Sequence, residues 1–154
     1  MTDYSKAFEE GLQAAKRTDV ARKEIASVFS DFKTQVEKMT GGKILVELDE
    51  RIERDAQSDI VFSPFRQAKK YLAIVVFNPL DKGNTLRELA RWKISSFGYP
   101  CILRWGDHEE SCGDKRALEE GLASILQDAR IGEKILYAMN FEKPKEPPKV
   151  IEKK

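Results

Sequence analysis

The run from Tyr71 to Phe77, YLAIVVF, is the longest apolar stretch of the chain. It is rich in β-branched residues, and it lacks the alternation of apolar and polar positions that marks a strand with one solvated face. The run is far shorter than the ~20 residues needed to cross a bilayer, and Asn78-Pro79 ends it. It therefore predicts a strand in the centre of a sheet, with both faces buried.

The composition is that of a globular protein with one core. The 154 residues are 41% hydrophobic and 34% charged, which excludes a disordered chain. The net charge of +1 gives no large basic excess of the kind that marks strong nucleic-acid binders. The first residues, MTDYSKAFEEGLQ, carry acids where a secretory signal needs an apolar core. We therefore expect a cytoplasmic protein without membrane association.

Residues 4–39 are predicted to be helical. Apolar residues recur at steps of four and three on one stripe, namely Ile25, Phe29, Phe32, Val36 and Met39. An earlier stripe consists of Phe8, Leu12 and Ala15. The two stripes do not join in phase, and Thr18-Asp19 between them has good N-cap chemistry. We therefore expect a break or bend near residue 18 and a helix end at Gly41-Gly42.

Two segments that precede the apolar run are predicted to be strands. Residues 43–53, KILVELDERIE, place apolar residues at alternate positions, which is typical of a strand with one solvated face. Residues 60–65 form a shorter strand that contains Pro64, which cannot donate to a ladder and so indicates an edge or a strand end. Because the connections are short, these two strands and residues 71–77 are expected to form a three-stranded antiparallel meander.

Residues 85–97 are predicted to form a helix. Thr85-Leu86-Arg87-Glu88 matches a capping box, which opens a helix, and Gly98 supplies the usual stop. The buried side of this helix would consist of Leu86, Leu89, Ala90, Ile94 and Phe97. Residues 99–105 then form a fourth strand, and the crossover helix makes a parallel, right-handed connection to it possible.

Two helical segments follow. The first carries Leu118, Leu122, Ile125 and Leu126, and the second runs from Glu133 to Met139 after an interruption at Gly132. From residue 142 the chain reads EKPKEPPKVIEKK, whose prolines and charges cannot bury a core. The predicted architecture is a single α+β domain, α-βββ-α-β-α, at residues 1–141, with a disordered, charged, proline-rich tail at residues 142–154.

Residues 104–116, RWGDHEESCGDKR, contain the only histidine, His108, and one of the two cysteines, Cys112. A structural zinc site needs four ligands, typically two closely spaced pairs, and the chain has no second Cys/His pair. A Cys112 nucleophile with His108 as its base, four residues away on a helix, is disfavoured because neighbouring carboxylates oppose a thiolate. We therefore expect no metal, no cofactor and no catalytic residue here. The favoured interpretation is a solvated loop leading into a helix capped by Ser111 or Asp114, with an exposed histidine and a semi-buried cysteine.

The order of helix, three strands, helix and strand resembles the core of the PD-(D/E)xK nuclease fold, as topology only. That chemistry needs an aspartate and a nearby acid-x-lysine on adjacent strands to hold magnesium beside the scissile phosphate. Here Asp59 is followed by Gln67-Ala68-Lys69, so that glutamine replaces the second acid. The resemblance therefore implies a fold relative that has lost catalysis.

The distribution of charge indicates a binding surface. Residues 83–106 contain four basic residues and one acid, whereas residues 107–141 contain eight acids and four basic residues. Charged rims of this kind steer the encounter of two proteins. We expect a non-enzymatic binding protein that acts through a protein partner, as an inhibitor, an immunity factor or an adaptor. The candidate partner-binding residues are Arg87, Arg91, Arg104, Asp107, Glu109 and Glu110.

A nucleic acid is the alternative partner. Arg87 and Arg91 would lie one turn apart on the predicted helix, with Trp92 and Lys93 close by, and such groups can hold phosphates and stack on bases. An amphipathic helix with a solvated basic edge explains the same residues, since a tryptophan can cover the edge of a core.

Overall fold

The strands of the protein form a simple antiparallel meander. A computed structural model of the chain describes residues 1–53, 69–83 and 85–140. Its elements are α1 (Tyr4–Met39), β1 (Leu45–Ile52), β2 (Lys70–Phe77), β3 (Arg87–Ser95), β4 (Gly98–Trp105), β5 (His108–Cys112), α2 (Lys115–Gln127) and α3 (Ala129–Met139). The strands are ordered β1-β2-β3-β4-β5 across the sheet, each antiparallel to the next. The predicted α+β class in a single domain is confirmed.

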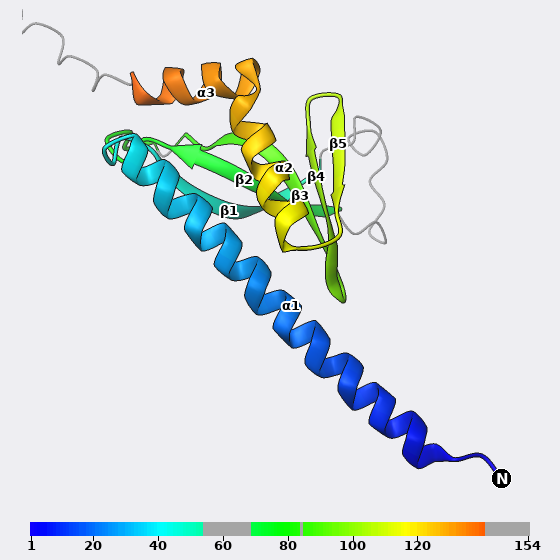
Figure 1. The fold of residues 1–154 in the computed structure, drawn as a ribbon. Coiled ribbons are helices and arrows are strands. Elements are labelled where there is room, and N and C mark those ends of the chain that lie inside the picture. The colour runs from blue at the N-terminus through cyan, green and yellow to red at the C-terminus, as the bar shows by residue number, and fades with distance from the viewer. Residues whose placement is uncertain (54–68, 84, 141–154) are drawn as a thin grey trace, which may run out of the picture.

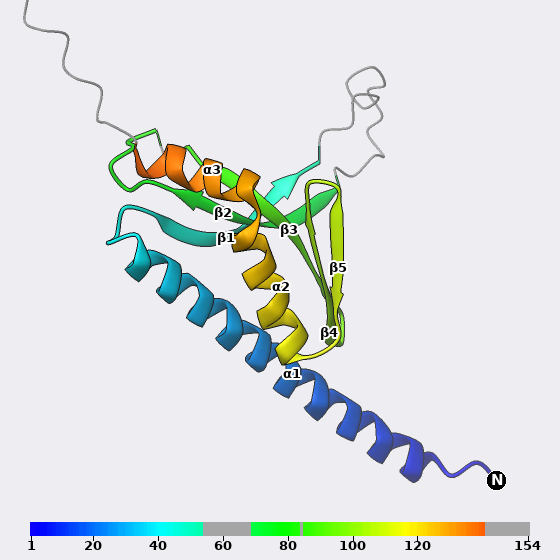
Figure 2. The same ribbon diagram turned by 45° about the horizontal axis from the view of Figure 1, so that its top comes forward.

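The three helices pack against one face of the sheet, and the first half of α1 extends well beyond it (Figure 1 and Figure 2). One core joins the helices to the inward side chains of the strands, including Ile74, Val76, Trp92 and Leu103. Ala73 and Val75 alternate with Ile74 and Val76 along β2 and therefore lie on the opposite face, yet they are also buried. The prediction that residues 71–77 form a strand with both faces buried is thus confirmed, but the strand is the second of the five and β3 occupies the centre of the sheet.

Helix α1 is continuous, and the predicted break near residue 18 is wrong. The helix begins at an Asp3 cap, whose carboxylate accepts from the Ser5 amide at 3.1 Å, and ends just before Gly41-Gly42 as predicted. Asp19 forms an i, i+4 ion pair with Lys23 at 3.1 Å instead of capping a second helix. The Asp19 carboxylate therefore has a charged partner without any change in the direction of the helix.

Residues 87–95 form β3, so the predicted helix at 85–97 is wrong. The strand is paired on both sides, with β2 and β4. A bulge between Ile74 and Val75 shifts the register, and as a result both Leu89 and Ala90 are buried in the core together with Trp92. The spacing of these three buried residues resembles that of the apolar stripe of a helix. Because β3 replaces the crossover helix, the strand at 98–105 is antiparallel to its predecessor rather than parallel.

The hairpin of β4 and β5 replaces the predicted solvated loop. Trp105 pairs with His108 across a two-residue turn, and Gly106 adopts φ +57 in that turn, a conformation that favours glycine. Asp114 caps α2 by accepting from the Ala117 amide at 2.8 Å. The break that follows α2 lies at Asp128, not at Gly132 as predicted, because the Asp128 side chain caps α3. Because β1 pairs directly with β2, the predicted meander with a further strand between these two is wrong. The predicted strand at 60–65 and the predicted tail at 142–154 fall outside the described residues.

Candidate partner-binding site

A row of paired residues crosses the sheet on the face opposite the helices. In register, Asp49 faces Ala73, Ala73 faces Arg91, Arg91 faces Arg104 and Arg104 faces Glu109. The adjacent residues Ala90, Trp92 and Leu103 point into the core, so that the row itself points away from it. The structure thus brings together three predicted site residues, Arg91, Arg104 and Glu109, that the sequence separates.

The two arginines of the row differ in their surroundings. The Arg91 guanidinium lies 3.3 Å from a Glu53 carboxylate oxygen and 4.0 Å from the centre of the Tyr71 ring. Arg104 is exposed and makes no ion pair within the described residues. Like charges directly opposite each other on adjacent strands are unfavourable. The pair is therefore only partly neutralised, and Arg104 remains able to bind an anionic group.

A polar hollow of about 280 Å³ adjoins this pair. It is lined by Glu53, Glu88, Leu89, Ala90, Arg91, Arg104, Trp105, Gly106 and Lys134. The ladder between β3 and β4 begins at Arg91 and Arg104, and residues 87–90 pair with β2 alone. Lys134 of α3 donates to the Glu88 carbonyl at 2.9 Å. The hollow therefore combines three basic side chains, two acids and a short strand edge that pairs with no second strand of the described structure.

Side chains at the margin of the hollow restrain one another. Arg51 approaches Glu88 at 3.9 Å. Burial, together with a hydrogen bond to Glu88 and the charge of this acid, raises the pKa of Tyr71. The Tyr71 hydroxyl therefore stays protonated at neutral pH. Tyr71 therefore interacts with the Arg91 guanidinium through its aromatic ring and not through a negatively charged oxygen.

The remaining predicted partner-binding residues lie elsewhere. Arg87 stacks on the Tyr137 ring of α3, 4.2 Å from its centre, on the helix side of the sheet. Glu110 is partly buried, and its Oε2 lies close to Gly121 of α2 without a hydrogen-bond partner in the described structure. Asp107 is exposed in the turn between β4 and β5. Two of the six predicted residues, Arg87 and Glu110, therefore do not lie on the open face of the sheet, which is the face opposite the helices.

Trp92 and Lys93, which were predicted as possible nucleic-acid contacts, point in opposite directions. Trp92 is 1% exposed and packs edge-on against Phe29, so that its ring is not accessible for stacking on a base. Lys93 is exposed and follows Arg91 by two residues along β3, which places it on the same face of the sheet.

Cys112 and His108, which the sequence analysis disfavoured as a catalytic pair, do not form a dyad. Both residues lie on β5, and four residues of a strand separate them by about 13 Å. Burial, with a contribution from Glu110, raises the pKa of the Cys112 thiol to about 11. His108 is exposed as predicted and packs on Trp105, with ring centres 4.6 Å apart. Cys112 is fully buried rather than semi-buried. Within the described ranges, no three His, Cys, Asp or Glu side chains are grouped in a way that could hold a metal ion.

The topological resemblance to the nuclease fold loses its basis, because it depended on a helix where β3 is found. Asp59 and Gln67-Ala68 fall outside the described residues, and Lys69 is exposed just before β2.

The sequence analysis did not identify Glu53 and Lys134, which line the hollow, or Tyr71, which lies against Arg91. Because successive side chains of a strand point to opposite faces, the strand at 71–77 could have placed Tyr71 on the same face as Ala73. Lys134 lies 46 residues from its acceptor Glu88, and no local pattern connects them.

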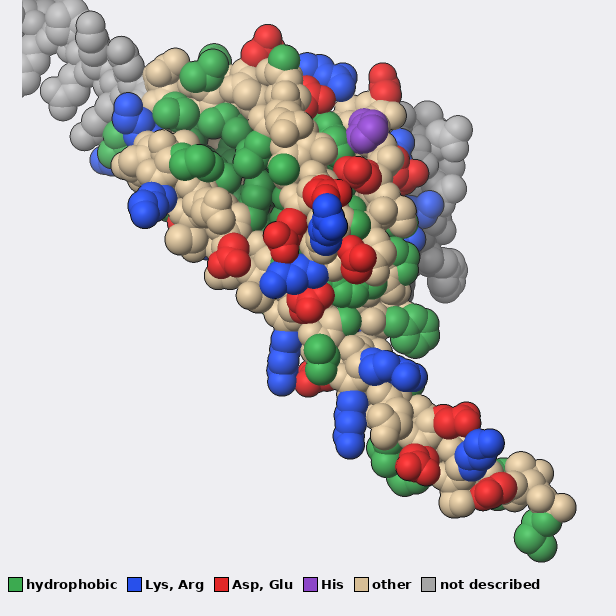
Figure 3. Space-filling model, viewed as in Figure 1, with side chains coloured by type: hydrophobic (Ala, Val, Ile, Leu, Met, Phe, Trp, Pro, Cys, Tyr) green, Lys and Arg blue, Asp and Glu red, His purple; other side chains and the backbone are tan. Residues whose placement is uncertain are grey.

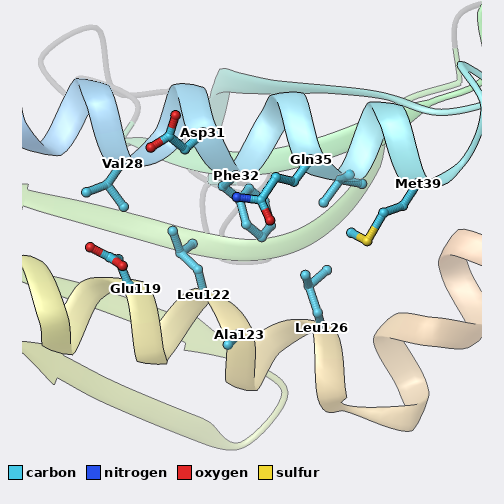
Figure 4. A pocket seen from close by; sticks show the side chains of 10 residues that line it. Val28, Asp31, Phe32, Gln35, Met39, Glu119, Leu122, Ala123 and Leu126 are labelled. Atoms are coloured by element: carbon cyan, nitrogen blue, oxygen red, sulfur yellow. The ribbon is translucent and has the colours of Figure 1, made fainter.

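A second hollow, of about 250 Å³, lies between α1 and α2 (Figure 4). Leu122 and Leu126 of α2 point across it toward α1, and Asp31 and Glu119 lie at one end. Hydrophobic side chains gather in this part of the surface, where the helices meet (Figure 3). Apart from Asp31, Gln35 and Glu119, the residues that line the hollow are apolar. Such a lining is typical of a gap between packed helices.

No protein family model, curated protein or solved structure matches this chain. Among the described residues, no helix has both the length and the apolar character that a membrane span requires.

Proposed function

We propose that the protein is a non-enzymatic binding protein that recognises a protein partner at Arg91 and Arg104. The observation that supports this function best is the direct opposition of these two arginines on β3 and β4, of which Arg91 alone forms an ion pair within the described residues, although Glu109 lies opposite Arg104 on β5. A carboxylate placed between the guanidinium groups would relieve their repulsion. Arginine binds carboxylates in bidentate geometry, so the partner is expected to present an acidic side chain.

The strand edge beside the arginine pair favours an extended segment of the partner. Residues 87–90 are paired on one side only, and a strand added to such an edge contributes backbone hydrogen bonds. Glu109 and Asp107 would lie at the rim of the interface, where their negative charges repel a strongly acidic surface. Partners with such a surface would therefore be disfavoured. An inhibitor, an immunity factor or an adaptor would act in this way, because each works by binding its partner and not by catalysing a reaction.

A nucleic acid fits the same face less well. Arg91, Lys93 and Arg104 could contact phosphates, but Glu53 and Glu88 line the hollow between the strands. These acids oppose a polyphosphate backbone, and the buried Trp92 offers no surface for stacking. The charge of the site therefore favours a single acidic side chain over a run of phosphates.

The test uses three forms of the full chain on a nuclease-treated native lysate: wild type, Arg104→Glu, and Lys43→Glu as a matched control. Lys43 is an exposed base just before β1. We expect a protein that wild type and the control retain and that Arg104→Glu loses, although the melting curves of all three coincide. With the purified partner, raising the ionic strength should slow association with wild type. Equal capture by Arg104→Glu would contradict the proposal, as would a partner that wild type captures only from a parallel lysate without nuclease treatment.

A further inference from the structure

An apolar hollow of about 400 Å³ lies between the middle of α1 and the sheet. The first half of α1 projects beyond the sheet (Figure 1), and the hollow lies near the point where the helix leaves the sheet. We name it the Arg22 hollow. Its lining consists of Arg22, Ile25, Ala26 and Phe29 of α1, Leu48 of β1, and Trp92 and Ile94 of β3. All of these side chains except that of Arg22 are apolar.

The size and lining of the Arg22 hollow are those of a small-molecule site. Its buried part contains the rings of Trp92 and Phe29, which meet edge-on with centres 5.7 Å apart. Ala26 and Ile94 are exposed and lie toward solvent. Sites for small molecules are typically concavities of ~300–1,000 Å³, with a mainly apolar and aromatic lining and a few polar groups that orient the ligand. In this hollow, the polar group is the Arg22 guanidinium.

A hydrogen bond holds the Arg22 guanidinium at the hollow. Its Nη2 donates to the Ser96 carbonyl of the β3–β4 hairpin at 2.6 Å. A guanidinium has five N–H donors in a rigid, planar fork, and this bond uses one of them. The side chain is therefore oriented by the protein and keeps donors for a ligand.

The charge of Arg22 has no carboxylate partner within the described residues. Asp19, three residues earlier on α1, pairs with Lys23 at 3.1 Å, and Glu24 accepts from the Tyr99 hydroxyl at 2.7 Å. No acid lines the hollow. Arginine binds carboxylates through charge-assisted, bidentate hydrogen bonds. The guanidinium and the apolar lining together therefore match a ligand with one carboxylate and an apolar body.

The hollow between α1 and α2 differs from the Arg22 hollow in charge. Its lining is also largely apolar, but Asp31 and Glu119 lie at one end. These carboxylates would repel an anionic ligand, and such repulsion contributes to the choice between two otherwise similar sites. An apolar acid is therefore expected to prefer the Arg22 hollow.

We propose that the Arg22 hollow binds a small monocarboxylic acid. The carboxylate accepts hydrogen bonds from the Arg22 guanidinium, and the aliphatic or aromatic body of the acid lies against Trp92 and Phe29. The site is on the helix side of the sheet and shares no residue with the Arg91 and Arg104 site, so that it does not depend on the function proposed above.

The first experiment titrates the full chain with octanoate, phenylbutyrate and octanol at neutral pH and follows two-dimensional ¹H–¹⁵N NMR spectra. At least one of the two acids should shift the indole N–H of Trp92 and the amides of residues 22–29, with a dissociation constant below about 1 mM. Octanol should bind roughly tenfold more weakly than octanoate, because it lacks the charge. Absence of these shifts with both acids would overturn the proposal, as would equal affinities for octanoate and octanol.

The second experiment tests whether Arg22 binds the carboxylate. Arg22→Gln should raise the dissociation constant of the bound acid by roughly tenfold or more, since a charged hydrogen bond is lost, and should leave that of octanol unchanged. Lys16→Gln is the matched control, because Lys16 is an exposed base on α1 that does not line the hollow. Equal weakening of the acid and octanol by Arg22→Gln would indicate a distorted hollow and contradict the proposed role of the charge.

The third experiment fills the hollow with a side chain. Ala26 lines the hollow and is exposed, so that Ala26→Phe places a ring where the body of the acid would lie. Binding of the acid should be lost, although the melting temperature should change little. Ala7→Phe, at an exposed position of α1 outside the hollow, should bind like wild type. Wild-type affinity in Ala26→Phe would mean that the acid binds elsewhere, and the proposal would be wrong.

Discussion

Cys101 and Cys112 lie directly opposite each other on β4 and β5, and both side chains are fully buried. Burial raises the pKa of both thiols, and nearby Glu110 adds to the effect at Cys112, whose pKa rises to about 11. The two thiols are therefore neutral packing groups at physiological pH. Their role is to fill the space between the sheet and α2, where Leu118 and Leu122 also pack.

The elevated pKa of Cys112 makes stability depend on pH in the alkaline range. The unfolded thiol ionises near its ordinary value of 9.0, whereas the folded thiol is held neutral to about 11. The unfolded state therefore loses protons first, and the free energy of unfolding should fall as pH rises through this window. Urea unfolding at several pH values measures the fall. The fall in the free energy of unfolding should be smaller in Cys112→Ala. An identical pH dependence in both proteins would show that the Cys112 thiol does not contribute to it.

Gly98 should tolerate no side chain. Its φ of +95 favours glycine, and an added Cβ would lie 2.8 Å from the Ala21 Cβ of α1. Gly98→Ala should lower the free energy of unfolding by about 2 to 4 kcal/mol through backbone strain and displacement of the helix. Gly42→Ala is the control, because Gly42 has φ +80 with open space around it. Equal losses in the two variants would mean that contact with α1 adds nothing to the strain.

Val75 should contribute to stability although none of the three described helices covers its face of the sheet. It is 1% exposed, and Val75→Ala should lower the free energy of unfolding by roughly 1 to 3 kcal/mol through lost burial and a cavity. Leu80→Ala, at a residue that is 64% exposed, should change it little. Chemical denaturation of both variants provides the comparison. A neutral Val75→Ala would contradict the burial of this face.

Glu109 and Glu110 should respond differently to the same substitution. Glu110 faces α2 with a buried, unpaired Oε2, whereas Glu109 is exposed on the open face. Replacing an unsatisfied buried oxygen with an apolar group removes a desolvation penalty of about 1 to 3 kcal/mol. Glu110→Met should therefore raise the free energy of unfolding, and Glu109→Met should leave it nearly unchanged. Destabilisation by Glu110→Met would indicate that the carboxylate has a partner in the folded protein.

The sequence predicted those elements that local patterns determine. The apolar run at 71–77, the alternation at 43–53 and the stripe ending at Gly41-Gly42 correspond to β2, β1 and the end of α1. The helix prediction for residues 85–97 was wrong for two reasons. Leu, Arg, Glu and Ala favour helices, and the bulge at Ile74 and Val75 gives the buried residues of β3 the spacing of a helical stripe. Pairing on both sides overrides this local preference. For β5, the Gly106-Asp107 dipeptide was a hairpin signal that could have been recognised.

The candidate site depends on register, which is why the sequence predicted only part of it. Arg91 and Arg104 become neighbours through the pairing of β3 with β4, and a shift of one residue would turn them to opposite faces of the sheet. Arg87 was grouped with Arg91 on the assumption of a helix, in which residues four apart share a face. In the strand, the bulge places Arg87 on the other side, against Tyr137.

The meander also has a consequence for the order of events during synthesis. Each strand pairs with its neighbour in the chain, and from β2 to β5 the connecting segments are at most nine residues long, so that the entropy lost at each of these steps is small. The hydrogen bonds that fasten α1 to the β3–β4 hairpin, from Arg22 to Ser96 and from Tyr99 to Glu24, instead span 74 and 75 residues. Helix α1, which is synthesised before the strands, therefore reaches its final position only after β4 has emerged from the ribosome.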